Sequence, residues 1–280
     1  MGLGIAIGLG VGIGGGLAPL TMSAPPAVIS QVNFNFIVTG PANTLTFTSN
    51  DGSAVLPSNS TLTSGTGTFT ASLKTAGTKT LTATDTANAA ITATDSIHVG
   101  AKIVYDAFTD TDDVTLDSHT PNVAPGGSVW SNATYKISSN EAVAAPGGTV
   151  VIDAGVSDGW VICEIDNDQN SDGVAVRSGD SGAYLRISIE SDQLKMAYDN
   201  GSGGTGSGGV SITGTFSTPY TLYIQLNGSL VSCYAIGEDF TVSTTSAELS
   251  IPTAFNQTVT THGICGGHAE TKWLNFAVIG

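Results

Sequence analysis

The chain has 280 residues and a formal net charge of −15, and only 11% of its residues are charged. An average soluble domain carries about 25% charged residues. Here Gly, Ser, Thr and Asn take their place, as is typical of all-β proteins with many turns. A surface this acidic repels phosphates, which argues against nucleic-acid binding. The cysteines form neither a disulfide framework nor a zinc motif, so we expect buried free thiols at Cys163, Cys233 and Cys265.

The first sixteen residues, MGLGIAIGLGVGIGGG, alternate glycine with aliphatic residues. A period of two is that of a β-strand, so one face would be an apolar ridge and the other bare backbone that a second strand can approach. We expect residues 1–30 to form an anchoring arm followed by a Pro-rich linker, with a disordered tail as the alternative. No basic residue precedes Lys74, which argues against a signal peptide, and the glycines argue against a membrane-spanning helix. The residues expected to contact the partner are Leu3, Ile5, Ile7, Leu9, Val11 and Ile13.

Residues 31–100 contain short alternating runs about ten residues apart, separated by Gly, Pro, Asn and Asp, which predicts a small antiparallel sandwich. Val32, Phe34, Phe36, Leu45 and Phe47 are expected to face its core. The stretch LKTAGTKTLTATDTANAAITATDSIHV resembles the bacterial immunoglobulin-like repeats of surface and phage proteins. The resemblance implies a spacer module that carries no chemistry.

Residues 101–280 contain at least ten further alternating segments and no convincing helical period, which predicts a larger β-sandwich. The opening DAFTDTDDVTLDSHTP, the pair PYTLYIQLNGSLVSCYAIGE and the closing KWLNFAVIG resemble the concanavalin A-like, laminin-G-like jelly rolls. That family includes carbohydrate binders, glycosidases and inert structural modules, so the resemblance implies the fold and leaves the ligand open. The predicted fold class is therefore all-β, with an immunoglobulin-like sandwich followed by a jelly roll.

Two acidic clusters are candidates for calcium, the only cofactor that the sequence suggests, because calcium takes six to eight oxygen ligands. The alternative is a solvated turn rich in Asp and Asn. The first cluster, IDNDQNSDG, offers Asp166, Asp168, Asn170 and Asp172, and the second offers Asp106, Asp110, Asp112, Asp113 and Asp117. The segment HGICGGH, with His262, Cys265 and His268, is a weaker metal pattern without a fourth ligand.

Catalysis is not expected, because a glycosidase of the two-carboxylate type needs a carboxylate pair across a cleft. Glu164 and Asp166 share one strand face, with Cys163 and Ile165 pointing the other way, but no second Glu follows them. Sugar binding uses exposed aromatic faces together with amides and acids. The best candidate set at a loop mouth is Tyr198, Asp199 and Asn200.

The two resemblances and the arm lead us to expect a non-enzymatic structural virion protein of a bacteriophage: a head decoration, head fibre or collar appendage. Its arm would dock on a capsid, neck or other virion protein, and its jelly roll would face outward and bind host surface glycans. We expect assembly in the host cytoplasm, display on the virion surface, a homo-oligomer, with a trimer as the guess, and no membrane span. The alternatives are a bacterial surface adhesin or filament subunit and a secreted glycoside-active enzyme.

Overall fold

A computed structural model describes residues 19–131, 135–144, 148–166, 172–179, 182–190, 193–200, 205–206, 211–213, 218–237, 242–243, 249–250, 257–266, 268 and 270–280. Within these ranges the regular secondary structure is almost entirely β-strand, as the sequence predicts, and the one helical element is a short 3-10 turn, η1, at Pro125–Gly127. The described residues include no helix with the length and apolar character needed to cross a membrane. Of the arm and linker predicted at residues 1–30, residues 1–18 lie outside the described residues, whereas Thr21–Ser23 and Ala27–Ile29 are strands of the first sandwich and not a linker.

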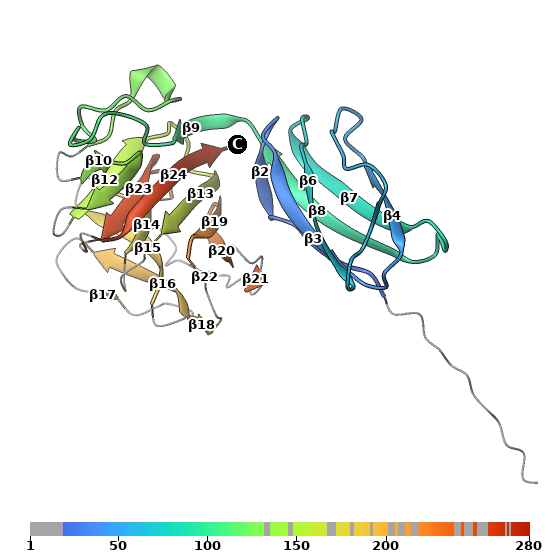
Figure 1. The fold of residues 1–280 in the computed structure, drawn as a ribbon. Helices are drawn as coiled ribbons and strands as arrows, with labels where there is room; N and C mark the ends of the chain where they lie inside the picture. Colours follow the sequence, from blue (N-terminus) through green and yellow to red (C-terminus); the bar gives the residue numbers. More distant parts are fainter. Residues whose placement is uncertain are drawn as a thin grey trace, which may run out of the picture.

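Two sheets from residues 21–100 pack face to face and form the first sandwich (Figure 1). One sheet has the strand order β1-β3-β6 and the other β2-β8-β7-β4-β5. Their inner faces share one apolar core that includes Phe36, Leu45 and Phe47, as predicted. The strands are β1 (Thr21–Ser23), β2 (Ala27–Ile29), β3 (Phe34–Thr39), β4 (Thr44–Ser49), β5 (Ser60–Thr61), β6 (Thr66–Ala71), β7 (Gly77–Asp85) and β8 (Thr92–Gly100).

The core prediction is wrong for Val32, whose surface is 39% exposed. This residue precedes β3 and lies in a turn, where its backbone N–H donates to the carbonyl of Ile29. Alternation between core and solvent begins only inside the strand, so the pattern does not apply at Val32. Phe34, at the first position of β3, is half-buried and packs against the edge of the core.

Two larger sheets from residues 102–279 form the second sandwich, with one continuous core between them (Figure 1). The nine-stranded sheet follows the order β10-β11-β24-β13-β19-β20-β21, with β9 beside β24 and β22 beside β20. The seven-stranded sheet follows the order β12-β23-β14-β15-β16-β17, with β18 beside β16. All three cysteines are buried free thiols, as predicted.

The strands of the nine-stranded sheet are β9 (Lys102–Asp106), β10 (Tyr135–Ser138), β11 (Glu141–Ala144), β13 (Gly159–Asp166), β19 (Tyr220–Asn227), β20 (Leu230–Gly237), β21 (Val242–Ser243), β22 (Leu249–Ser250) and β24 (Lys272–Ile279). Those of the seven-stranded sheet are β12 (Gly148–Asp153), β14 (Gly173–Val176), β15 (Ala183–Ile189), β16 (Gln193–Asn200), β17 (Thr205–Gly206), β18 (Ser211–Thr213) and β23 (Thr261–Gly266). Six of these strands were not expected from the sequence: β9, β11, β17, β21, β22 and β23.

Candidate functional site

The predicted calcium ligands are only partly described, and the part that is visible does not form a metal site. Asp168 and Asn170 lie outside the described residues. Asp166 ends β13, whereas Asp172 is fully buried beside β14 and accepts hydrogen bonds from the backbone N–H and, at 3.1 Å, the Nδ1 of His268. Across the described residues, no group of three or more His, Cys, Asp or Glu side chains is arranged to hold a metal ion.

The acidic segment at the start of the second sandwich, residues 106–121, contains a buried hydrogen-bond network. Asp106, at the end of β9, is fully buried and accepts hydrogen bonds from Trp130 Nε1 at 2.7 Å and from the backbone N–H of Phe108 at 2.9 Å. Its Oδ1 also lies 2.9 Å from Nε2 of His119, whose Nδ1 lies 3.1 Å from Asp110. Burial alone would lower the pKa of His119, but its bonds to the two aspartates outweigh burial and raise it. Two of the five acids predicted for calcium, Asp106 and Asp110, therefore hold His119, whereas Asp112 accepts a hydrogen bond from the backbone N–H of Ser139 and Asp113 pairs with Lys136.

The segment HGICGGH is mostly a strand, and its three candidate ligands do not converge. His262 is buried in β23, lies 3.0 Å from the carbonyl of Val156 through Nε2, and has a pKa lowered to about 4, mainly by burial. Cys265 is buried three residues further along the same strand. His268 instead contacts Asp172. Consecutive buried positions place most of this segment inside the seven-stranded sheet.

The predicted sugar contacts Tyr198, Asp199 and Asn200 are the last three residues of β16. Their backbone pairs with β15, where Tyr198 lies opposite Leu185 and Asp199 opposite Tyr184. Their side chains lie outside the described part of the structure. The three residues thus share a strand end, and their role in binding stays a prediction.

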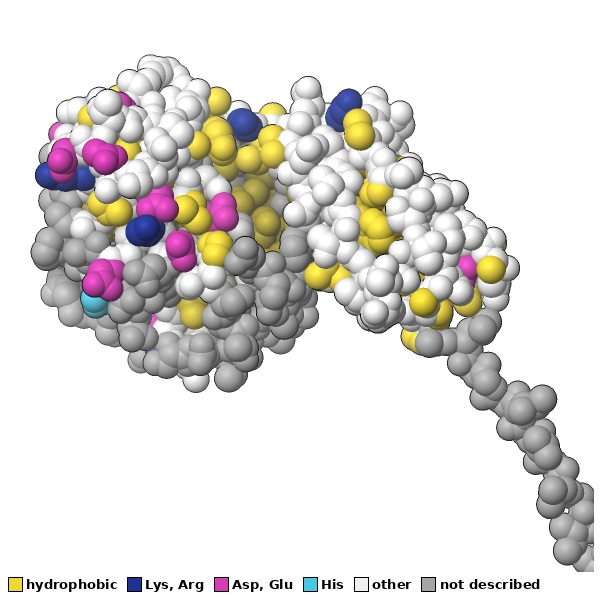
Figure 2. All heavy atoms as spheres, viewed as in Figure 1, with side chains coloured by type: hydrophobic (Ala, Val, Ile, Leu, Met, Phe, Trp, Pro, Cys, Tyr) yellow, Lys and Arg dark blue, Asp and Glu magenta, His cyan; other side chains and the backbone are white. Residues whose placement is uncertain are grey.

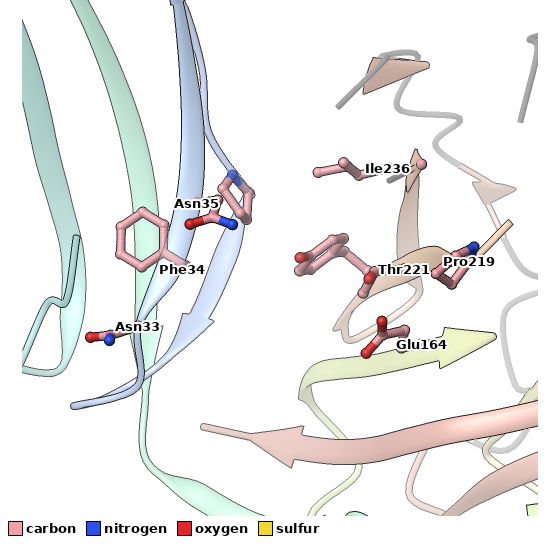
Figure 3. Close-up of a pocket in the computed structure, with 10 residues that line it drawn as sticks. Asn33, Phe34, Asn35, Glu164, Pro219, Thr221 and Ile236 are labelled. Atoms are coloured by element: carbon pink, nitrogen blue, oxygen red, sulfur yellow. The ribbon is translucent and has the colours of Figure 1, made fainter. Parts of the chain in front are cut away.

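A cleft of about 540 Å³ lies between the two sandwiches. One wall comes from the first sandwich, through Pro25 and the segment 33–35, and the other from β13, β19 and β20 of the second (Figure 3). Apolar side chains gather where the two sandwiches meet (Figure 2). Ligand sites are common at such junctions, and this volume lies in the usual range of ligand pockets.

The second wall is the outer face of the nine-stranded sheet. On β13, Trp160, Ile162 and Glu164 alternate with Val161 and Cys163, which face the core. Strand pairing then builds rows across the sheet, because residues opposite each other on neighbouring strands share a face. The first row contains Asn275, Glu164, Thr221 and Ile236, and the second contains Ala277, Ile162, Tyr223 and Tyr234.

The first row carries the polar chemistry of the cleft. The Nδ2 of Asn275 donates a hydrogen bond of 2.5 Å to Oε2 of Glu164, which fixes the carboxylate at the cleft wall. Burial, together with the negative charge of Glu164, raises the pKa of Tyr223, so its phenol stays protonated and can donate a hydrogen bond. Thr221 adds a hydroxyl on the same wall.

The amides of Asn33 and Asn35 lie on the opposite wall, which the first sandwich supplies (Figure 3). Both side chains are exposed. Asn35 is held in part by Thr70, whose hydroxyl donates to Asn35 Oδ1 at 2.7 Å. The amide N–H groups are donors and their oxygens acceptors, so this wall complements the carboxylate and hydroxyl across the cleft.

A separate apolar contact joins the sandwiches beyond the polar row. Ala27 of β2 packs with Trp160, Ile162, Ala277 and Ile279 of the second sandwich in one buried cluster. The ring of Trp160 stacks between His98 of β8, at 6.1 Å, and Tyr234 of β20, at 6.0 Å. Burial lowers the pKa of His98, which favours its neutral form in this contact. Trp160 and Ile162 explain why β13 is apolar on both faces.

No protein-family model and no curated protein matches this sequence. Solved structures with similar folds include a galectin from Caenorhabditis elegans, with 18% identity, a TM-score of 0.33, and coverage of 49% of this chain and 93% of that chain. A carbohydrate-binding module from Bacillus subtilis has 18% identity, a TM-score of 0.31, and coverage of 54% and 91%. The Bacteroides ovatus protein SGBP-B of a mixed-linkage glucan utilization locus, in complex with a mixed-linkage heptasaccharide, has 12% identity, a TM-score of 0.33, and coverage of 95% and 53%. At these values the likenesses carry no information on the ligand of this chain.

Proposed function

We propose that this chain is a non-enzymatic glycan-binding protein whose site is the cleft between its two sandwiches. The observation that carries the proposal is the carboxylate of Glu164, held by Asn275 on one wall of a cleft that Asn33 and Asn35 line from the other sandwich. Sugar hydroxyls both donate and accept hydrogen bonds, so a carboxylate and amides on opposing walls suit them. Tyr223 adds aromatic surface with a hydrogen-bonding tip.

The acidic lining of the cleft suits sugar binding without hydrolysis. Glu164 is the only acidic side chain among the described residues that line the cleft. Acid-base cleavage of a glycoside by the common route needs two carboxylates, about 5 to 9.5 Å apart. Asp166 lies past an irregularity in the pairing of β13 with β24, opposite Lys272, and does not line the cleft. The geometry therefore favours recognition over catalysis.

A glycan array probed with the full chain, followed by calorimetric titration of the strongest binder, tests this proposal. Glu164→Gln should weaken binding about tenfold or more, because a hydrogen bond to a charged group contributes about 1.5–3 kcal/mol. Glu190→Gln is the matched control, since Glu190 is also a partly buried glutamate but bonds to Lys195 and Arg186 at the end of β15. Equal affinity of Glu164→Gln and the unaltered chain, or no glycan bound on the array, would contradict the proposal.

We also propose that the chain displays this site on a phage virion as a decoration, fibre or collar appendage, anchored through residues 1–16. The support is the alternation of glycine with aliphatic residues in that segment, which suits strand addition into a groove of a capsid or neck protein. A chain that lacks residues 1–16 should fail to co-sediment with particles while it still binds glycan. Normal decoration by the truncated chain would contradict the anchor.

A further inference from the structure

The cleft continues into a smaller apolar groove of about 120 Å³. The two share Asn33, Phe34 and Tyr223 as lining residues, so they form one continuous depression. The remaining lining of the groove is aliphatic and comprises Ala27, Val28, Ile29, Val32 and Ile162. A ligand held by the polar row of the cleft would therefore meet an apolar surface on one side.

The polar and apolar rows have a fixed spacing, because they belong to the same strands. Glu164 and Ile162 are two residues apart on β13, and Thr221 and Tyr223 are two residues apart on β19. Residues i and i+2 on a strand lie about 7 Å apart. A sugar ring hydrogen-bonded at Glu164 can thus extend a substituent from its polar contacts into the groove.

The charge of the lining further limits the ligand. Glu164 is the only charged side chain among the described residues that line the cleft and the groove, and no Lys or Arg is among them. An acidic sugar would place its carboxylate near Glu164 without a cation to balance it, in a chain of net charge −15. The site therefore suits a neutral sugar and disfavours uronic and sialic acids.

Building on the proposed glycan-binding function, we infer that the ligand is a neutral glycan whose sugar unit carries a methyl-bearing substituent, either an acetamido or a 6-deoxy group, and that the methyl enters the groove. The polar row binds the hydroxyls, and the aliphatic groove removes the methyl from water. Val32, whose exposed side chain lines the groove, becomes covered by the ligand. This also accounts for an exposed valine at the mouth of the cleft.

Matched sugars test the inference by calorimetric titration with the full chain. N,N′,N″-Triacetylchitotriose and cellotriose share one backbone and differ in the acetamido group at C2, and L-fucose and L-galactose differ in the 6-deoxy group. In at least one pair the methyl-bearing member should bind about fourfold tighter or more, since burial of one methylene-sized group contributes about 0.8 kcal/mol. The pair that discriminates identifies which substituent the groove accepts.

Val32→Ser should bring this ratio toward one, whereas Val55→Ser should leave it unchanged, because Val55 is 54% exposed and lines neither the cleft nor the groove. Equal affinities within both pairs, or an unchanged ratio in Val32→Ser, would overturn the inference and leave glycan binding intact. If none of the four sugars binds while the array identifies another glycan, the inference fails and the proposed function stands. Absence of any glycan binding overturns both.

Discussion

Replacement of Asp106 by alanine should destabilise the second sandwich more than any change at a partly exposed acid of the same region. The Asp106 carboxylate is fully buried and serves three groups: the side chains of His119 and Trp130 and the backbone N–H of Phe108. Asp106→Ala leaves these donors buried without an acceptor and leaves His119 with one aspartate instead of two. The perturbation therefore acts on a network that joins β9 to the loops that follow it.

The expected loss is about 3–5 kcal/mol, the range for removal of one partner from a buried charged pair. A single hydrogen bond to a charged group contributes about 1.5–3 kcal/mol, but contributions within one network are not additive. Since the urea dependence of the free energy of unfolding is about 1–3 kcal/mol per molar, the urea midpoint should fall by about 1 M or more. A protein whose total stability is about 5–15 kcal/mol would lose much of it.

Tryptophan fluorescence measures this change selectively, because all three tryptophans, Trp130, Trp160 and Trp273, belong to residues 101–280. Asp110→Ala is the control, since Asp110 is partly exposed and accepts from His119 at the outer end of the network. We expect a much smaller shift of the midpoint for this variant. Equal shifts for Asp106→Ala and Asp110→Ala would refute the argument that burial of the Asp106 carboxylate sets the cost.

Three further predictions concern pH and backbone packing. Because the pKa of His119 is raised, its contribution to stability is complete below its unfolded pKa of about 6.5 and is lost as pH rises through the folded value. The urea midpoint should therefore fall with rising pH, and it should fall less in His119→Asn. Burial alone would raise the pKa of Asp51, but its hydrogen bonds hold that pKa well below its usual range. The contribution of Asp51 to the stability of the first sandwich should therefore be complete above about pH 4 and be lost as pH falls. Circular dichroism of an isolated 19–100 fragment and of its Asp51→Ala variant measures this loss. Gly263→Ala should prevent folding, because a Cβ at this position would overlap the carbonyl oxygen of Val150. Gly52→Ala is the control and should fold, since a Cβ there would meet nothing within 4 Å. Soluble yield and thermal unfolding distinguish the two variants.

Although the short alternating strand β11 was missed, most long strands whose side chains alternate between core and solvent were predictable. β19 is an example, because its buried and half-buried residues alternate along YTLYIQLN. β23 was missed because four consecutive residues, from His262 to Cys265, are buried and the segment contains Gly263. That glycine is required because the backbone of β12 lies against it, which is a tertiary constraint that no local pattern contains.

The cleft could not be predicted, because its walls join residues 33–35 to residues 164–237. One signal was nevertheless present in the sequence. In WVICEI the residues on both faces of the strand are apolar up to Glu164, which indicates a strand covered on both sides, although an isolated sandwich would expose one of them. The covering element is the first sandwich, whose Ala27 and His98 contact that face. Tyr198, which the sequence offers as a sugar contact, lies on β16 of the seven-stranded sheet, whereas the cleft is lined by the nine-stranded sheet.

The position of β24 has a consequence for the order in which the chain can fold during synthesis. The first sandwich has all its strands by Gly100, so it can fold as soon as that residue has left the ribosome. The second sandwich cannot close its nine-stranded sheet at that stage, because β24, at residues 272–279, pairs with β9, β11 and β13. Its early strands therefore wait for most of the domain to be translated. The first sandwich, whose Ala27 and His98 contact the outer face of β13, can already be folded when Trp160 and Ile162 are made.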